Sequence, residues 1–176
     1  MLLPNPLSVL GLLGLNPAIS NPPEWYDTTT ALITQGPHWL LSAPDTTPGG
    51  KVVLEHTRPR AGILPRHRWV VARHGDTLLR AYGTDLCLSV DTYGNGWAPV
   101  DGDSVVLVRC PEREERATLW AWERAADGHA FALTADGEGE DRKFWLARPD
   151  GEGPVSVSER WGETVMWGVE RLDWID

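Results

Sequence analysis

The sequence predicts an all-β fold built from three repeats, and two observations carry that prediction. From residue 30 onward, short apolar runs rich in β-forming residues alternate with Gly, Pro and Asn turns, and no long stretch has helical periodicity. Trp69, Trp120 and Trp167 lie at near-equal intervals in similar apolar settings. Because self-similarity at a fixed period indicates a repeat architecture, we expect three equivalent units.

Each unit is expected to contain four short strands in the same order. The predicted strands are residues 31–33, 39–43, 52–54 and 67–71; 78–82, 86–90, 105–108 and 118–122; and 130–133, 144–147, 155–157 and 165–169. Three such units can close into a barrel capped by hairpins, which removes exposed sheet edges. The pattern is typical of a β-trefoil domain over residues 30–176, with repeats at about 30–76, 77–128 and 129–174.

The first 29 residues differ in composition and are expected to form an apolar extension with a Pro-rich linker. The Asn-Pro pair at residues 5–6 fits the start of a short helix. Because an apolar helix is normally buried, we expect Leu7, Leu10 and Leu13 to dock on the domain itself, on a second copy or on a protein partner. The segment is too interrupted for a membrane span and lacks the positive start of a secretory signal, so secreted and cytoplasmic locations both stay open.

Charge and motifs exclude several function classes. Sixteen basic against twenty-five acidic residues give a net charge of −9, which argues against nucleic-acid binding and against a polybasic membrane-surface protein. The sequence has no P-loop, no Gly-x-Ser-x-Gly nucleophile motif and no His spacing typical of a metal site. We therefore expect a non-enzymatic protein without a metal or cofactor.

The middle unit carries a more specific pattern. It contains Cys87-Leu88-Ser89-Val90, an apolar run that ends in Cys110, and Leu119-Trp120. This resembles the ricin-B type of β-trefoil lectin, whose repeats carry Cys-Leu-Asp-Val, a hydrophobic strand ending in Cys, and Gln-x-Trp. The resemblance implies carbohydrate binding and, because that family bridges the two cysteines of a repeat, a Cys87–Cys110 disulfide.

The chain departs from the lectin pattern at the sugar-binding positions. The Asp of Cys-Leu-Asp-Val is Ser89, and the aromatic position of the following strand falls on Val108. The Gln of Gln-x-Trp is replaced by His67, Thr118 and Val165 in the three units, and His67 is interpreted as structural. The resemblance therefore implies a lectin with a diverged sugar site.

A loop in the middle unit offers other sugar-binding groups. Tyr93 and Trp97 can stack on a sugar ring, and Asp91, Asn95 and Asp101 can hydrogen-bond to its hydroxyls. The competing interpretation is a Gly-rich hairpin loop whose tryptophan folds back on the barrel.

The third unit resembles instead the fungal β-trefoil protease inhibitors, through its strand at 144–146, an acidic Gly turn and the closing strand around Trp167. That resemblance implies an exposed inhibitory loop. The basic loop at residues 57–66 contains Arg58, and Arg60-Ala61 fits the P1 and P1′ positions of a trypsin-like substrate. Prolines would stiffen this loop, although charged loops are more often simply solvated. A lectin is thus the first prediction, with a protease inhibitor and an assembly module as alternatives.

Overall fold

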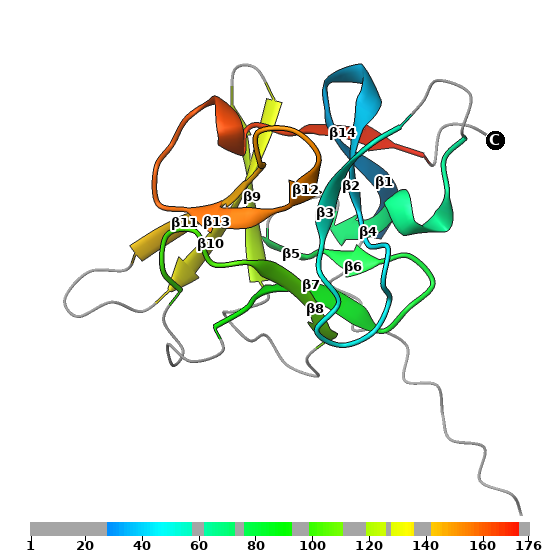
Figure 1. The fold of residues 1–176 in the computed structure, drawn as a ribbon, viewed down its shortest axis with the longest axis horizontal. Helices are drawn as coiled ribbons and strands as arrows, with labels where there is room; N and C mark the ends of the chain where they lie inside the picture. The colour runs from blue at the N-terminus through cyan, green and yellow to red at the C-terminus, as the bar shows by residue number, and fades with distance from the viewer. Residues whose placement is uncertain are drawn as a thin grey trace, which may run out of the picture.

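The computed structural model describes residues 28–57, 62–72, 76–92, 99–110, 119–125, 128–135 and 142–172. These residues form three successive units of the same plan, coloured from blue to blue-green, from green to yellow-green, and from yellow to red in Figure 1. The described residues contain strands and three short 3-10 turns, which confirms the predicted all-β class.

The strands follow the same order in each unit. The first unit contains β1 (Thr28–Gln35), η1 (Gly36–His38), β2 (Trp39–Ser42), β3 (Val53–His56), η2 (Pro65–His67) and β4 (Arg68–Ala72). The second contains β5 (Asp76–Leu78), β6 (Arg80–Ala81), β7 (Leu86–Val90), β8 (Val105–Arg109) and β9 (Leu119–Ala125). The third contains β10 (Gly128–Ala135), β11 (Arg142–Ala147), β12 (Gly153–Pro154), β13 (Ser156–Ser158), η3 (Glu163–Val165) and β14 (Gly168–Arg171).

The first and last strands of the units close into a barrel. Strand β1 pairs with β4, β4 with β6, β5 with β9, and β9 with β10, all antiparallel. A single bridge joins His129 of β10 to Trp167, directly before β14, and β14 pairs back with β1. Strands β5 and β6 are separated only by Leu79, so together they carry the ring from β4 to β9, and the ring returns to its first strand.

The middle strands of each unit form a hairpin, and the three hairpins share one register. Opposite residues are Leu41 and Leu54 in β2–β3, Leu88 and Leu107 in β7–β8, and Leu146 and Val157 in β11–β13. This common register identifies equivalent positions in the three units.

Three valines tie the hairpins together. The backbone N–H of Val52 donates to the carbonyl of Val105 (3.2 Å), and that of Val105 donates to the carbonyl of Val155 (3.2 Å). The cycle is completed by Val155, whose N–H donates to the carbonyl of Val52 (3.0 Å). All three side chains are fully buried, so the cycle satisfies backbone groups that water does not reach.

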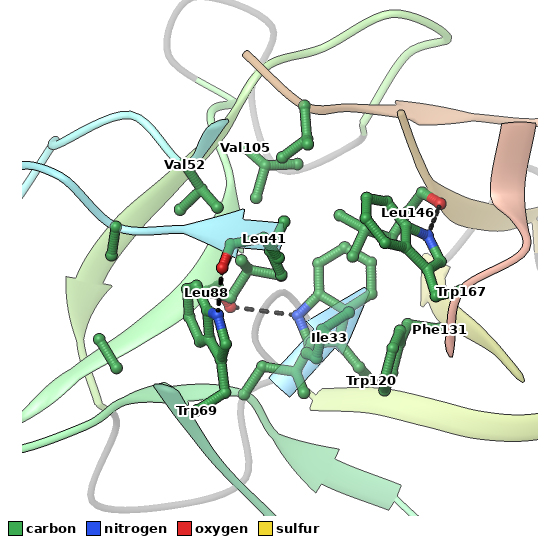
Figure 2. Packing of buried hydrophobic residues seen from close by; sticks show 14 of the residues in the cluster. Ile33, Leu41, Val52, Trp69, Leu88, Val105, Trp120, Phe131, Leu146 and Trp167 are labelled. Atoms are coloured by element: carbon green, nitrogen blue, oxygen red, sulfur yellow. Dashed lines mark hydrogen bonds between the residues drawn. The ribbon is translucent and has the colours of Figure 1, made fainter. Parts of the chain in front are cut away.

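The repeated tryptophans fill the core between barrel and hairpins (Figure 2). Each indole N–H donates to the carbonyl of the equivalent leucine in its own unit: Trp69 to Leu41 (3.0 Å), Trp120 to Leu88 (3.1 Å) and Trp167 to Leu146 (2.9 Å). A buried Trp supplies a large apolar surface but needs a partner for its N–H. The repeated carbonyl provides that partner at the same place in every unit.

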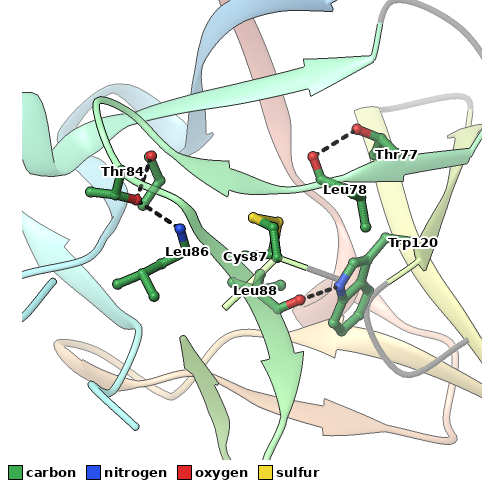
Figure 3. The surroundings of a disulfide bond; sticks show 9 residues. Thr77, Leu78, Thr84, Leu86, Cys87, Leu88 and Trp120 are labelled. Carbon is green, nitrogen blue, oxygen red and sulfur yellow. Dashed lines mark hydrogen bonds between the residues drawn. A yellow bond between two sulfur atoms is a disulfide. The ribbon is translucent and has the colours of Figure 1, made fainter. Parts of the chain in front are cut away.

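The disulfide implied by the lectin resemblance is present between Cys87 and Cys110, whose Cα atoms are 4.9 Å apart (Figure 3). Cys87 is buried in β7, and the N–H of Cys110 donates to the carbonyl of Asp85 (2.8 Å). The bond thus joins the start of β7 to the end of β8.

The predicted helical extension, including Leu7, Leu10 and Leu13, lies outside the described residues and stays a prediction. No helix in the described ranges has the length and apolar character needed to cross a membrane.

Candidate functional site

The predicted sugar-binding loop is described only at its two ends, because Tyr93, Asn95 and Trp97 lie outside the described residues. Asp91 is exposed, and its backbone N–H donates to the carbonyl of Ser104 (2.7 Å). Asp101 is also exposed, and its Oδ1 accepts a hydrogen bond from the backbone N–H of Glu159 (2.9 Å). Asp101 therefore links the middle and third units, and its role toward a sugar stays a prediction.

The predicted inhibitory residues Arg58, Arg60 and Ala61 also lie outside the described residues. The structure describes the residue just before them, Thr57, which is held by two hydrogen bonds to the carbonyl of His38. Its backbone N–H donates over 2.7 Å and its Oγ1 over 3.2 Å. The inhibitory role stays a prediction.

The hairpin register locates the sugar position of the lectin pattern in the other two units. Ser42 and Ala147 are equivalent to Ser89, because the three residues face Val53, Ser156 and Val106 respectively. By the same register, Glu55 and Ser158 are equivalent to Val108. The lectin pair of an Asp and an aromatic residue is thus absent from these positions in all three units.

In the first unit the lectin position is filled by a network of polar side chains. Glu55 accepts hydrogen bonds from Arg66 Nη2 (2.6 Å), Arg66 Nε (3.1 Å) and Ser42 Oγ (2.8 Å). The Arg66 hydrogen bond is the main reason that the pKa of Glu55 falls from its usual 4.5 to about 2. Partial burial opposes the fall, while Ser42 and His67 add to it. Glu55 is therefore ionised at neutral pH and holds the Arg66 guanidinium in place.

His67, like Ser42, is a buried member of this network. Its Nδ1 accepts a hydrogen bond from the backbone N–H of Leu64 (3.2 Å), so the ring proton of the neutral form belongs on Nε2. That nitrogen lies 3.3 Å from Glu55 Oε2 and can donate to it. The residue at the Gln-x-Trp position thus anchors η2, as expected for a structural histidine.

A cavity of about 360 Å³ lies directly beside the network. That volume falls in the range typical of small-molecule sites. The cavity lies between the first unit and the start of the second, and its lining residues are Ala43, Pro44, Thr46, Leu64, Pro65, Arg66, Ala81 and Tyr82.

One residue that lines the cavity, Ala43, is smaller than its equivalents in the other two units. The backbone N–H of Ala43 donates to the carbonyl of Arg66 (2.9 Å), and the equivalent bond in the third unit joins Arg148 to Thr164 (2.9 Å). The middle unit carries Val90 at this position, directly after Ser89. Alanine leaves space where valine and arginine extend a larger side chain.

The rim of the cavity combines an aromatic ring with hydrogen-bond donors. Tyr82 is 43% exposed, and the Arg68 guanidinium lies over its ring, 5.6 Å from the centroid. An arginine has five N–H donors. The described structure uses the Nε–H and one Nη2–H of Arg66 on Glu55, which leaves the other N–H groups of this residue for a ligand. Arg66 is therefore held by Glu55, and Tyr82 is held by its contact with Arg68. Because both side chains are positioned before a ligand arrives, the entropy cost of binding is lower.

Tyr82 was missed by the sequence analysis, although a signal was present. Tyr82 directly follows β6 and precedes Gly83 and Thr84. An aromatic residue at the start of such a turn is placed to be exposed rather than to fill the core. Arg66 was noticed only as part of a basic loop. As for metals, the described part of the chain contains no group of three His, Cys, Asp or Glu residues placed to hold an ion.

Comparison with known proteins supports the architecture. The sequence matches no known family description and no curated protein. A designed threefold-symmetric protein, ThreeFoil, superposes with a TM-score of 0.60 at 18% identity, covering 81% of this chain and 99% of the design. The chain has the β-trefoil fold.

Two natural proteins share this β-trefoil. A mosquitocidal holotoxin matches 83% of this chain with 17% of its own length, at a TM-score of 0.63 and 14% identity. The agglutinin from Abrus precatorius matches 81% of this chain with 48% of its own length, at a TM-score of 0.52 and 14% identity. Identities this low establish a common fold, and a fold alone hosts many functions. The similarity to fungal inhibitors stays a prediction.

Proposed function

We propose that the protein binds carbohydrate without catalysing a reaction, and that the cavity beside Tyr82 is the binding site. The observation that carries this proposal is an exposed aromatic ring next to a guanidinium held in place by Glu55. Similarity in fold to an agglutinin supports the proposed class of ligand.

The lining of the cavity fits the two faces of a sugar ring. Tyr82, Pro44 and Pro65 offer apolar surface to the C–H face of a pyranose. The available N–H groups of Arg66 donate to sugar hydroxyls. Because the nearby Glu55 carboxylate compensates the charge of Arg66, the cavity favours a neutral, hydroxyl-rich ligand over an anion.

A glycan-array screen of the full chain tests the proposal with three variants. Tyr82→Ala removes the ring and Thr46→Trp fills the cavity from its rim, so each should lower the affinity for a bound neutral glycan by roughly tenfold or more. Ile63→Ala is the matched control, since Ile63 is 43% exposed near the cavity but does not line it. The control should bind as the unmodified protein does.

Two other outcomes would overturn the site or the function. Binding that survives Tyr82→Ala and Thr46→Trp but is lost in Trp97→Ala would move the site to the middle-unit loop. If no glycan binds, inhibition of trypsin that disappears in Arg60→Ala would establish the protease inhibitor instead.

A further inference from the structure

Two histidines of the first unit lie side by side at one end of its hairpin. His38 ends η1 and His56 ends β3, and their ring centroids are 5.9 Å apart with the planes at 53°. Both residues are exposed, and neither lines the cavity beside Tyr82. Spacing along the sequence does not reveal this pair, because the pairing of β2 with β3 brings the two residues together.

The hairpin fixes the backbone of both histidines. The N–H and Oγ1 of Thr57 donate to the carbonyl of His38 over 2.7 and 3.2 Å, and Trp39 lies directly opposite His56. The Trp39 indole, partly buried against the core, meets the His56 ring edge to face with centroids 4.8 Å apart. The two imidazoles therefore project from ordered backbone, which lowers the entropy cost of holding them on one ligand.

The imidazole nitrogens of both residues are available to a ligand. Among the described residues, the two rings contact each other and Trp39, and no hydrogen bond or ion pair engages either of them. His67 differs from this pair, since its Nδ1 and Nε2 face Leu64 and Glu55. A neutral imidazole nitrogen is the commonest metal ligand in proteins, so the chemistry of the exposed pair points to a metal ion.

The separation of the two rings fits a shared ion. Two imidazoles that bind one metal ion through nitrogens about 2.0–2.1 Å from it have ring centroids about 5–6 Å apart. The observed 5.9 Å lies in that range, so the rings need only turn about their side-chain bonds. The net charge of −9 adds a general attraction for cations.

We propose that His38 and His56 form a binding site for a divalent transition-metal ion. Imidazole ligands suit Cu²⁺, Ni²⁺ and Zn²⁺ and do not suit Mg²⁺, and affinity for a given nitrogen site is highest for Cu²⁺. Two ring nitrogens come from the protein, and water fills the other coordination positions. The proposal departs from the sequence-based expectation of a protein without a metal, which considered only spacing along the chain.

Titration calorimetry on the full chain without an affinity tag tests the site with CuCl₂, NiCl₂, ZnCl₂ and MgCl₂. We expect one Cu²⁺ per chain, weaker binding of Ni²⁺ and Zn²⁺, and no heat with Mg²⁺. His38→Ala and His56→Ala should each lower the affinity for Cu²⁺ by roughly tenfold or more, because one ligand of the pair is lost. His74→Ala removes another histidine of the chain as the matched control and should bind as the unmodified protein does.

Electron paramagnetic resonance of the Cu²⁺-loaded protein identifies the ligands directly. The spectrum should show two imidazole nitrogens in the unmodified protein and one in each single variant. Both substitutions are at exposed positions and keep the His38 carbonyl that Thr57 binds, so the variants should keep the native circular dichroism. Equal Cu²⁺ affinity in a folded His38→Ala, His56→Ala double variant, or Mg²⁺ binding as tight as Cu²⁺ binding, would overturn the proposal.

Discussion

The backbone N–H of Val155 donates to the carbonyl of Val52, which joins the third unit of the chain directly to the first. Val105 completes the cycle from the middle unit. Each hairpin therefore gives one bond to its neighbour and receives one from the other, so the three units stabilise one another.

Replacing Val52, Val105 or Val155 with alanine should destabilise the protein by about 1–3 kcal/mol, through lost burial and the cavity left behind. The three costs should be similar because the three side chains are all fully buried at equivalent positions. Chemical denaturation measures them, with the exposed Val100→Ala as a control expected to change stability by less than about 0.5 kcal/mol. A large cost at one valine alone would contradict the threefold equivalence.

Replacing Trp69, Trp120 or Trp167 with phenylalanine should cost about 2–4 kcal/mol each, because the acceptor carbonyl of the paired leucine is left unsatisfied and space opens in the core. Thermal and denaturant unfolding both report the change. The control Trp161→Phe alters an exposed indole and should leave stability nearly unchanged. If none of the three core substitutions lowers the free energy of unfolding, the indole hydrogen bonds contribute little to stability.

Removing the disulfide with a Cys87→Ala, Cys110→Ala double variant should cost about 3 kcal/mol, since the bond restricts the unfolded chain over a separation of 23 residues. The midpoint of thermal unfolding should fall in the variant. A reducing agent should lower the midpoint of the unmodified protein to a similar value and leave the variant unaffected. If neither the double substitution nor the reducing agent lowers the midpoint of thermal unfolding, the disulfide does not stabilise the protein.

Stability should depend on pH through Glu55, whose pKa is lowered from 4.5 to about 2 in the folded protein. A depressed carboxyl pKa contributes stability that is present above the ordinary pKa and is lost as the pH falls through the folded pKa. The stability advantage of the unmodified protein over Glu55→Gln should therefore shrink between about pH 4.5 and pH 2. Unfolding of both proteins at several pH values checks this, and a difference that stays constant over that range would contradict the role of Glu55.

The fold could be predicted because its main signals repeat along the chain. The apolar runs around Val52, Val105 and Val155 and the three core tryptophans recur in order, so each supports the interpretation of the others. The disulfide followed from the lectin resemblance of the middle unit. Neither prediction needed knowledge of which loops meet in space.

The candidate sites could not be predicted in this way because each depends on contacts between units or strands. The cavity is lined by Ala43 of the first unit and by an aromatic ring, Tyr82, from the next unit. The exposed ring of Trp161 likewise packs on Trp145, which is distant from it in the sequence. The sequence showed that Ser89 and Val108 differ from the lectin pattern in the middle unit. It could not show that Glu55 and Arg66 form an ion pair at the equivalent position of the first unit.

The two ends of the barrel meet, because the backbone N–H of Leu172 donates to the carbonyl of Thr30 (2.9 Å). A domain whose ends lie together tolerates circular permutation and insertion into another protein. Joining these ends with a short linker and opening the chain between two units should yield a permutant with the same barrel. The same adjacency would let the domain be placed within a surface loop of a host protein, where its binding surfaces remain accessible without separating the host's own segments.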